Sequence, residues 1–183
     1  SATAARQALH IVGGDSKAFL RSGAVGESLQ LAAHAGIVSY EPTELVITAK
    51  AGTRLGEIDA VLAESGQMLA FEPPHYSAES TVGGAVSCGL SGPARPYRGS
   101  VRDYVLGVEL VTGHGQALRF GGQVMKNVAG YDISRLVAGA YGTLGVVSEV
   151  SLRVVPRTRR ESTLSWPMSA DAGRSRMLEL AHQ

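Results

Sequence analysis

The chain alternates hydrophobic and polar positions over several short stretches, a pattern that predicts β-strands. Seven stretches share this alternation or a run of β-branched residues, and we predict strands at residues 10–12, 37–40, 45–49, 67–71, 104–112, 116–120 and 146–155. The strands at 104–112 and 116–120 form a hairpin around 113–115, and Pro156 is expected to end the last strand. The pattern therefore indicates a domain rich in short strands.

Apolar residues recur on one face at the helical spacing over residues 55–65, which predicts a helix there. We expect Thr53 to be its N-cap and Gly66 to stop it. Further helical segments are expected at 3–9, as the end of a helix, from Tyr131 or Asp132 to about residue 139, and at 169–183. Strands and helices do not alternate regularly, which disfavours a doubly wound fold and favours an α+β domain whose mixed β-sheets are flanked by helices.

The elements divide the chain into two regions. Residues 1–156 are expected to form one domain with an abbreviated start, because only a short segment precedes the first strand. Residues 157–183 are expected to be a linker followed by the beginning of a C-terminal region that continues in the natural protein. We find no internal repeat.

Composition narrows the class of protein. The 183 residues are 44% hydrophobic and 18% charged, as in folded soluble domains, and the net charge of +1 gives no field that would attract nucleic acid or an anionic membrane. The single cysteine, Cys88, cannot form an internal disulfide or contribute to a cysteine set for an iron–sulfur cluster, and is expected in the core. The five histidines lack metal-ligand spacing, so no metal is expected. With no signal peptide at 1–10 and no apolar run that could span a membrane, we expect a soluble cytoplasmic protein.

Glycine is abundant, with 23 residues gathered in a few short stretches. Residues 13–16 follow a strand, and their backbone N–H groups could line a concave phosphate site or an ordinary turn. Lys17 lacks the spacing of a P-loop lysine, and no dinucleotide fingerprint follows any strand. The small residues of 81–92 permit either contact with a flat ligand or close helix packing, and 139–147 reads by itself as a helix cap followed by a strand.

The order of these stretches is more specific than any one of them. Successive motifs at 73–74, 81–84, 99–107, 126–132 and 142–147 resemble the FAD domain of vanillyl-alcohol-oxidase-type (PCMH-type) flavoproteins. Within that superfamily, 90–96 and 120–126 resemble the FAD-binding subunits of glycolate oxidases. The resemblance runs from about Ile11 to Pro156 and so covers most of the chain.

The resemblance implies an FAD cofactor and assigns its contacts. The implied cofactor-binding residues are Gly13, Gly14, Asp15 and Ser16 around the pyrophosphate, Pro74, Thr81, Gly83 and Gly84 in a second flavin-contacting loop, Ser91 and Gly92 on the same wall, and Gly145 and Val146 near the end of the sheet. Related loops often carry a glycine where this chain has Asp15. A carboxylate beside a diphosphate is unfavourable unless it points away, so Asp15 bears directly on cofactor affinity.

Oxidation of a 2-hydroxy acid requires a base for the hydroxyl proton and a cation for the carboxylate. Arg95, Arg98 and Arg102 are the concentrated cations near a flavin loop, although arginines are usually solvated at the surface. His75 is the candidate base and is equally compatible with an ordinary loop position. Lys126 could face either the cofactor or solvent.

The resemblance thus implies an FAD-binding subunit of a multisubunit, flavin-dependent 2-hydroxy-acid (glycolate) oxidase. A second flavoprotein and an iron–sulfur subunit would complete the enzyme, so the isolated chain is expected to have little activity. The complex would be cytoplasmic or peripheral at the inner membrane. Two alternatives remain open: a subunit that keeps the fold without flavin, and the FAD domain of another enzyme, such as a D-lactate dehydrogenase or an alditol or aryl-alcohol oxidase.

Overall fold

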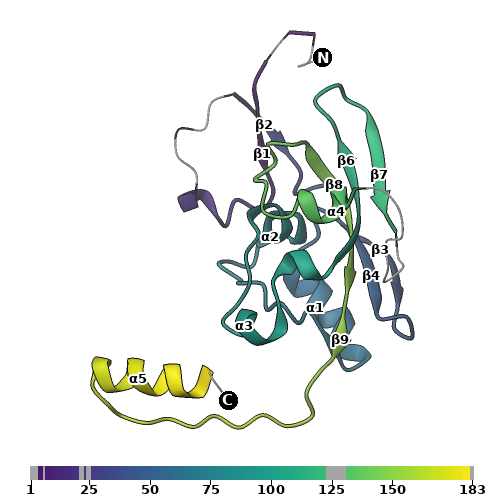
Figure 1. The fold of residues 1–183 in the computed structure, drawn as a ribbon. Coiled ribbons are helices and arrows are strands. Elements are labelled where there is room, and N and C mark those ends of the chain that lie inside the picture. Colours follow the sequence, from purple (N-terminus) through teal and green to yellow (C-terminus); the bar gives the residue numbers. More distant parts are fainter. Residues whose placement is uncertain (1–3, 6, 21–22, 24–25, 123–130, 182–183) are drawn as a thin grey trace.

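The main body of the molecule is a five-stranded sheet in the order β3-β4-β8-β6-β7 (Figure 1). The computed structural model describes all residues except 1–3, 6, 21–22, 24–25, 123–130 and 182–183. The strands are β3 (Ile37–Glu41), β4 (Val46–Lys50), β6 (Val105–Val111), β7 (Ala117–Gly121) and β8 (Val146–Arg153). All neighbouring pairs are antiparallel. β6 and β7 form the expected hairpin, and β8 lies at the centre of the sheet.

The apolar face of this sheet carries the core. Ile47 pairs with Leu152 in the register of β4 and β8, and Val150 pairs with Val108 of β6. These four side chains are at most 4% exposed and pack with α1 (Leu55–Glu64) and α2 (Val82–Cys88). The apolar alternation of the strands therefore produces a sheet with one face covered by helices.

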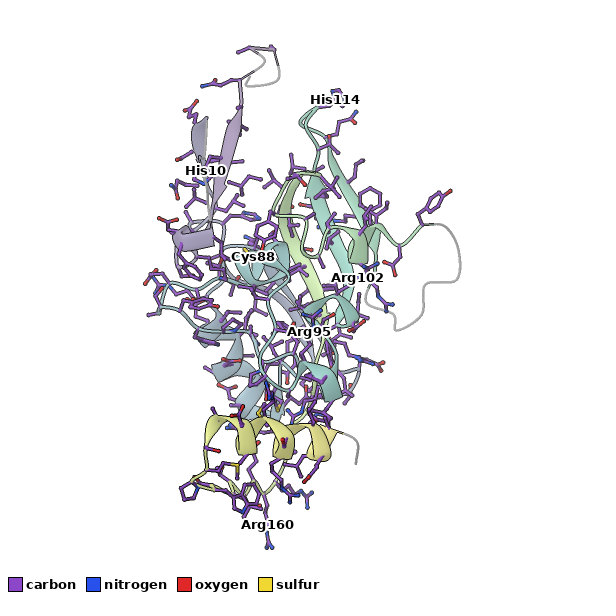
Figure 2. All side chains as sticks on the ribbon, turned by 60° about the vertical axis from the view of Figure 1, so that its left-hand side comes forward. His10, Cys88, Arg95, Arg102, His114 and Arg160 are labelled. Carbon is purple, nitrogen blue, oxygen red and sulfur yellow. The ribbon has the colours of Figure 1, made fainter. Side chains whose placement is uncertain are left out.

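A separate two-stranded sheet joins β1 (Leu9–Val12) to β2 (Glu27–Gln30) in parallel. His10 of β1 and Cys88 of α2, both labelled in Figure 2, line the same cavity. The chain between these strands contains residues 13–16 and a short 3-10 helix, η1 (Ala18–Leu20). A further small sheet pairs β5 (Gln67–Met68) with β9 (Val155–Pro156). The structure confirms the α+β fold, in which helices flank several sheets, with antiparallel pairing in two of them and parallel pairing in the third.

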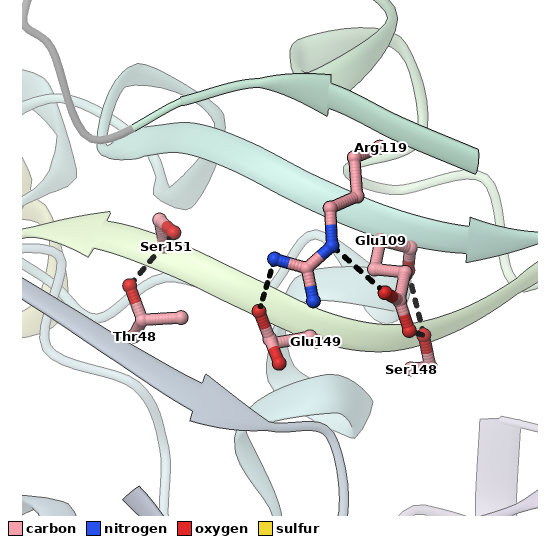
Figure 3. A network of polar contacts seen from close by, with 6 residues as sticks. All are labelled: Thr48, Glu109, Arg119, Ser148, Glu149 and Ser151. Carbon is pink, nitrogen blue, oxygen red and sulfur yellow. Dashed lines mark hydrogen bonds and ion pairs between the residues drawn. The ribbon is translucent and has the colours of Figure 1, made fainter. Parts of the chain in front are cut away.

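The other face of the main sheet is polar (Figure 3). Thr48 and Ser151 share a hydrogen bond of 2.8 Å between their hydroxyl oxygens. The Arg119 guanidinium lies 3.0 Å from Glu109 and 3.4 Å from Glu149. The Ser148 hydroxyl also donates to Glu109, and this bond is the main reason that the pKa of the Glu109 carboxyl lies below its usual value. Cross-strand polar pairs thus replace apolar packing on this side.

The remaining helices are short, apart from the last one. They are α3 (Arg95–Arg98), η2 (Val101–Asp103), α4 (Ile133–Leu136) and α5 (Ala170–Ala181). Figure 1 shows α5 after the extended segment that follows β9, and it has no buried residue. Among the described residues, no helix combines the length and apolar character that crossing a membrane would require.

Several sequence predictions about individual elements were wrong. Leu9 begins β1, and the described residues Ala4 and Ala5 form a turn, so the expected helix over 3–9 is not found. The strand expected at 67–71 covers only β5, because the chain turns at residues 70–71. The strand expected at 146–155 is divided into β8, which ends at Arg153, and β9, whose last residue is Pro156. Proline fits there because an edge position leaves its missing N–H without consequence. The strand β2 was not anticipated.

Helix ends were also predicted imperfectly. The helix at 55–65 is confirmed as α1, and Gly66 follows it with φ +64°. Thr53, however, is not its N-cap, because its hydroxyl donates to the carbonyls of Gly36 and Lys50 and Arg54 occupies the cap position. Asp132 does cap α4, but that helix is shorter than expected.

Candidate functional site

A cavity of about 660 Å³ lies beside β1 and α2. Three stretches that are distant in the sequence supply most of its lining: residues 9–17, 81–88 and 141–147. The volume falls within the range of about 300–1,000 Å³ that is typical of small-molecule sites. The cavity therefore brings together the glycine-bearing segments noted in the sequence.

The first wall is the turn at residues 13–16, directly after β1. A Cβ on Gly14 would lie 1.5 Å from the carbonyl oxygen of Glu79, and one on Gly13 would lie 2.7 Å from the hydroxyl oxygen of Thr81. Glycine is thus required because the turn packs directly against the backbone of 79–81. The Ser80 hydroxyl donates to Ser16 at 3.0 Å and fixes this contact.

The second wall is α2. The Thr81 hydroxyl caps it by accepting the backbone N–H of Gly84 at 3.2 Å, and Gly89 ends it with φ +67°. A Cβ on Gly83 would meet the Cβ of Ala51 at 2.5 Å, so the helix lies unusually close to the end of β4. The close helix packing that the sequence left open for this stretch is confirmed, and the same stretch also lines the cavity.

The third wall follows α4 and leads into β8. Tyr141 has φ +53°, and its backbone N–H donates to the carbonyl of Ser87 at 2.8 Å, which ties this wall to α2. Gly142 has φ +74°, and a Cβ there would lie 2.6 Å from the end of the Ile11 side chain. The third wall therefore contacts both α2 and β1, the strand that leads into the first wall.

The cavity contains a buried cation. Lys17 is 8% exposed, and its ammonium nitrogen lies 3.5 Å from the Ser16 hydroxyl oxygen. Burial lowers the pKa of Lys17. Burial also raises the pKa of the Cys88 thiol, an effect that the charge of Lys17 opposes. Asp15, with φ +52°, is exposed, whereas Lys17, two residues later, is buried.

The structure brings eight of the twelve predicted cofactor-binding residues to this cavity. They are Gly13, Gly14, Asp15, Ser16, Thr81, Gly83, Gly84 and Gly145. Pro74, Ser91, Gly92 and Val146 do not line it. The Ser91 hydroxyl accepts the Val101 N–H at 2.9 Å, and the Gly92 N–H donates to the Phe71 carbonyl at 2.8 Å, so both make structural hydrogen bonds.

The candidate catalytic residues lie outside the cavity lining. His75 is 3.1 Å from Asp59 of α1. The pKa of the Asp59 carboxyl is raised because burial outweighs the opposing effect of the histidine. Arg98 is 3.7 Å from Glu72, and its carbonyl accepts the Tyr104 hydroxyl. Arg95 and Arg102 are exposed (Figure 2). Lys126 falls outside the described residues.

Several lining residues were missed from the sequence. They are polar or reactive side chains at the cavity wall, namely Lys17, Ser87, Cys88, Tyr141 and Thr143. Gly84 and Cys88 are four residues apart on α2 and therefore share a face, which the helical period could have indicated. No sequence signal distinguished Lys17 from a solvated lysine.

The site fits a phosphate-containing cofactor. Glycines and hydroxyls let the backbone approach a ligand closely, and a buried ammonium group supplies a positive charge that an anion can pair with. Among the described residues, no group of three or more His, Cys, Asp or Glu side chains is arranged to hold a metal ion.

Comparison with known protein families agrees with this geometry. A family profile described as "FAD binding domain" matches residues 1–121. A solved structure of alkyldihydroxyacetonephosphate synthase superposes on 85% of this chain and 28% of its own, with a TM-score of 0.66 and 20% sequence identity. This structural likeness concerns the fold alone.

Curated relatives extend the comparison. The glycolate oxidase subunit GlcE of Escherichia coli (strain K12) is 55% identical over 171 residues, which are 93% of this chain and 49% of that protein. The glycolate oxidase subunit GlcD of Bacillus subtilis (strain 168) is 38% identical over 58% of this chain and 23% of its own length. A D-lactate dehydrogenase of Archaeoglobus fulgidus is 34% identical over 81% of this chain and 35% of its own. The chain spans about half or less of these relatives.

Proposed function

We propose that this chain, which belongs to the FAD-binding domain family, holds FAD in the cavity between β1, α2 and residues 141–147. It would do so as a subunit of a glycolate-oxidising flavoenzyme. The observation that supports this most strongly is the convergence of three glycine-bearing segments on one cavity that also contains a buried cation. The turn at 13–16 would hold the diphosphate, and the wall formed by α2 would lie along the flavin. When bound, FAD would accept the electrons removed from the hydroxyl-bearing carbon of the substrate.

The enzyme as a whole would be larger than this chain. That this chain covers 49% of the E. coli relative supports a whole protein longer than this chain. In this proposal, the domain at 1–156 is followed by a further region that would begin within 157–183. The substrate base and the carboxylate-binding cation would come from that region or from partner subunits. Arg98, Arg102 and His75 stay candidates for these roles only if the assembly brings them toward a substrate.

The partners in this proposal are a second flavoprotein subunit and an iron–sulfur subunit. The two glycolate oxidase relatives are named as different subunits, which supports an assembly of more than one kind of chain. The complex would work in the cytoplasm or on the inner face of the membrane, and the isolated chain would turn over little substrate.

The test begins with the visible absorption spectrum of the purified full chain, before and after addition of FAD and removal of unbound cofactor. Retention of a flavin spectrum, together with glycolate-dependent dye reduction only after coexpression with the partner subunits, is the expected result. A chain that stays colourless after added FAD would instead support a flavin-free assembly subunit. Robust glycolate oxidation by the isolated chain would contradict the proposed dependence on partners.

A second substrate class has specific support from the 34% identity to a D-lactate dehydrogenase. The same dye-reduction assay on the assembled complex would compare glycolate with D-lactate. A much higher kcat/KM for D-lactate would replace the glycolate assignment while leaving the FAD site intact.

A further inference from the structure

We propose that the Lys17 ammonium group is the counter-ion of the FAD diphosphate and makes this cavity selective for the dinucleotide over flavins that lack phosphate. The inference rests on the proposed FAD site. It concerns a side chain that follows the glycine turn and is distinct from the backbone groups expected to wrap the phosphates. It also assigns a role to a lysine that the sequence pattern left unexplained.

The position of Lys17 supports this role. Its side chain lines the cavity and is 8% exposed, although lysine is among the residues least often buried. Its ammonium nitrogen lies 3.4 Å from the position that a Cβ on Gly84 would occupy, at the first turn of α2. The charge is therefore held between the turn at 13–16 and the second wall, where the two meet.

The charges around Lys17 support an anionic ligand. Within the part of the chain that the structure describes, no carboxylate lies within ion-pair distance of this ammonium group, and its recorded polar contact is the Ser16 hydroxyl at 3.5 Å. Asp15 is the lining residue with a carboxylate, and it is exposed. A buried charge is costly unless a partner compensates it, and a ligand phosphate would be such a partner.

Selectivity follows from where the charge lies. FAD carries a diphosphate, whereas riboflavin has the same ring system and no phosphate. An ammonium group that pairs with the diphosphate stabilises bound FAD and contributes nothing to bound riboflavin. A lysine that merely supported the cavity wall would affect both ligands.

The test measures dissociation constants of FAD and riboflavin for the flavin-free full chain by isothermal titration calorimetry. Lys17→Met removes the charge and keeps a side chain of similar length. Lys50→Met is the matched control, because Lys50 ends β4, is not part of the cavity lining, and loses the same formal charge. We expect Lys17→Met to weaken FAD binding by about tenfold or more, as is typical for loss of a hydrogen bond to a charged group, with riboflavin binding within about twofold of the unmodified chain.

Several outcomes would overturn the inference. Lys17→Met could bind FAD as tightly as the unmodified chain, it could lose FAD and riboflavin equally, or Lys50→Met could reproduce its effect. Failure of the unmodified chain to bind FAD at all would overturn the proposed function itself and remove the basis of the inference. These results are therefore distinguishable.

A second variant and a second measurement cover the case in which Lys17→Met does not fold. Lys17→Arg keeps the charge and should retain most of the preference for FAD over riboflavin. In the unmodified chain, added salt should weaken FAD binding and leave riboflavin binding unchanged, because salt screens the charge pair. A Lys17→Arg chain that loses the preference for FAD over riboflavin would contradict the inference even if Lys17→Met does not fold.

Discussion

Replacing Gly83 with alanine tests whether the close approach of α2 to the sheet builds the cavity. A Cβ on Gly83 would lie 2.5 Å from the Cβ of Ala51 and 2.8 Å from its carbonyl oxygen. Carbon atoms in favourable contact are about 3.5–4.0 Å apart, so the helix must move by about 1 Å. The Gly83 N–H also donates to the Ala51 carbonyl at 2.9 Å, and that hydrogen bond would be strained by the movement.

Two opposing effects set the size of the change in the free energy of unfolding. Overpacking of a core costs about 1–3 kcal/mol, while replacing glycine by alanine inside a helix gains up to about 1 kcal/mol. We therefore expect Gly83→Ala to lower the free energy of unfolding by about 1–2 kcal/mol, since the steric cost is the larger of the two effects. Because Gly83 lines the cavity, FAD binding should weaken as well.

Gly56→Ala is the matched control. Gly56 lies in α1, and nothing lies within 4 Å of the position of its added Cβ. This variant should be as stable as the unmodified chain or up to about 1 kcal/mol more stable. Urea unfolding followed by circular dichroism measures both variants. A Gly83→Ala protein that unfolds at the same or higher urea concentration than the unmodified chain, with Gly56→Ala behaving as expected, would refute the packing argument.

Three further predictions follow from the walls of the cavity. Thr81→Ala should lower the free energy of unfolding by about 1 kcal/mol through loss of the α2 cap, whereas Thr81→Ser should keep most of it, as thermal unfolding would show. Burial lowers the pKa of Lys17 from 10.5, so the unfolded chain binds this proton more tightly than the folded chain does. The ligand-free fold should therefore gain stability as the pH rises from the lowered pKa toward 10.5. In urea titrations at several pH values, Lys17→Met should lack this gain and should be the more stable protein below that pH range. Burial raises the pKa of the Cys88 thiol, so iodoacetamide should label it slowly and more slowly still with FAD bound, and equal labelling rates by mass spectrometry would contradict its place in the cavity wall.

The sequence was sufficient for elements whose pattern is local. The helix α1 and the hairpin of β6 and β7 were predicted closely, because helical periodicity and a glycine-containing turn act within a few residues. Thr53 was misassigned because its hydroxyl bonds to Gly36, seventeen residues earlier, which no local cap pattern reveals. The strand β2 was missed for a similar reason, since it depends on pairing with β1.

The residues of the site likewise fall into those that local sequence patterns indicate and those whose position depends on tertiary packing. The glycine stretches could be located from the sequence, and their order indicated the family. Ser91 and Gly92 do not line the cavity despite belonging to such a stretch, because hydrogen bonds to Val101 and Phe71 direct them elsewhere. The buried position of Lys17 could not be predicted, because it depends on how residues 13–17 pack against α2.

The two-stranded sheet of β1 and β2 has a consequence for how a bound cofactor would leave. An isolated pair of strands is only marginally stable in water, whereas β8 is hydrogen-bonded on both sides within five strands. The wall carried by β1 should therefore open by local unfolding while the main sheet stays intact. In hydrogen exchange, the amides of Leu9–Val12 would exchange well before those of β8, and bound FAD would narrow that difference. The lifetime of the bound state would then be set by this small sheet and not by the global stability of the domain.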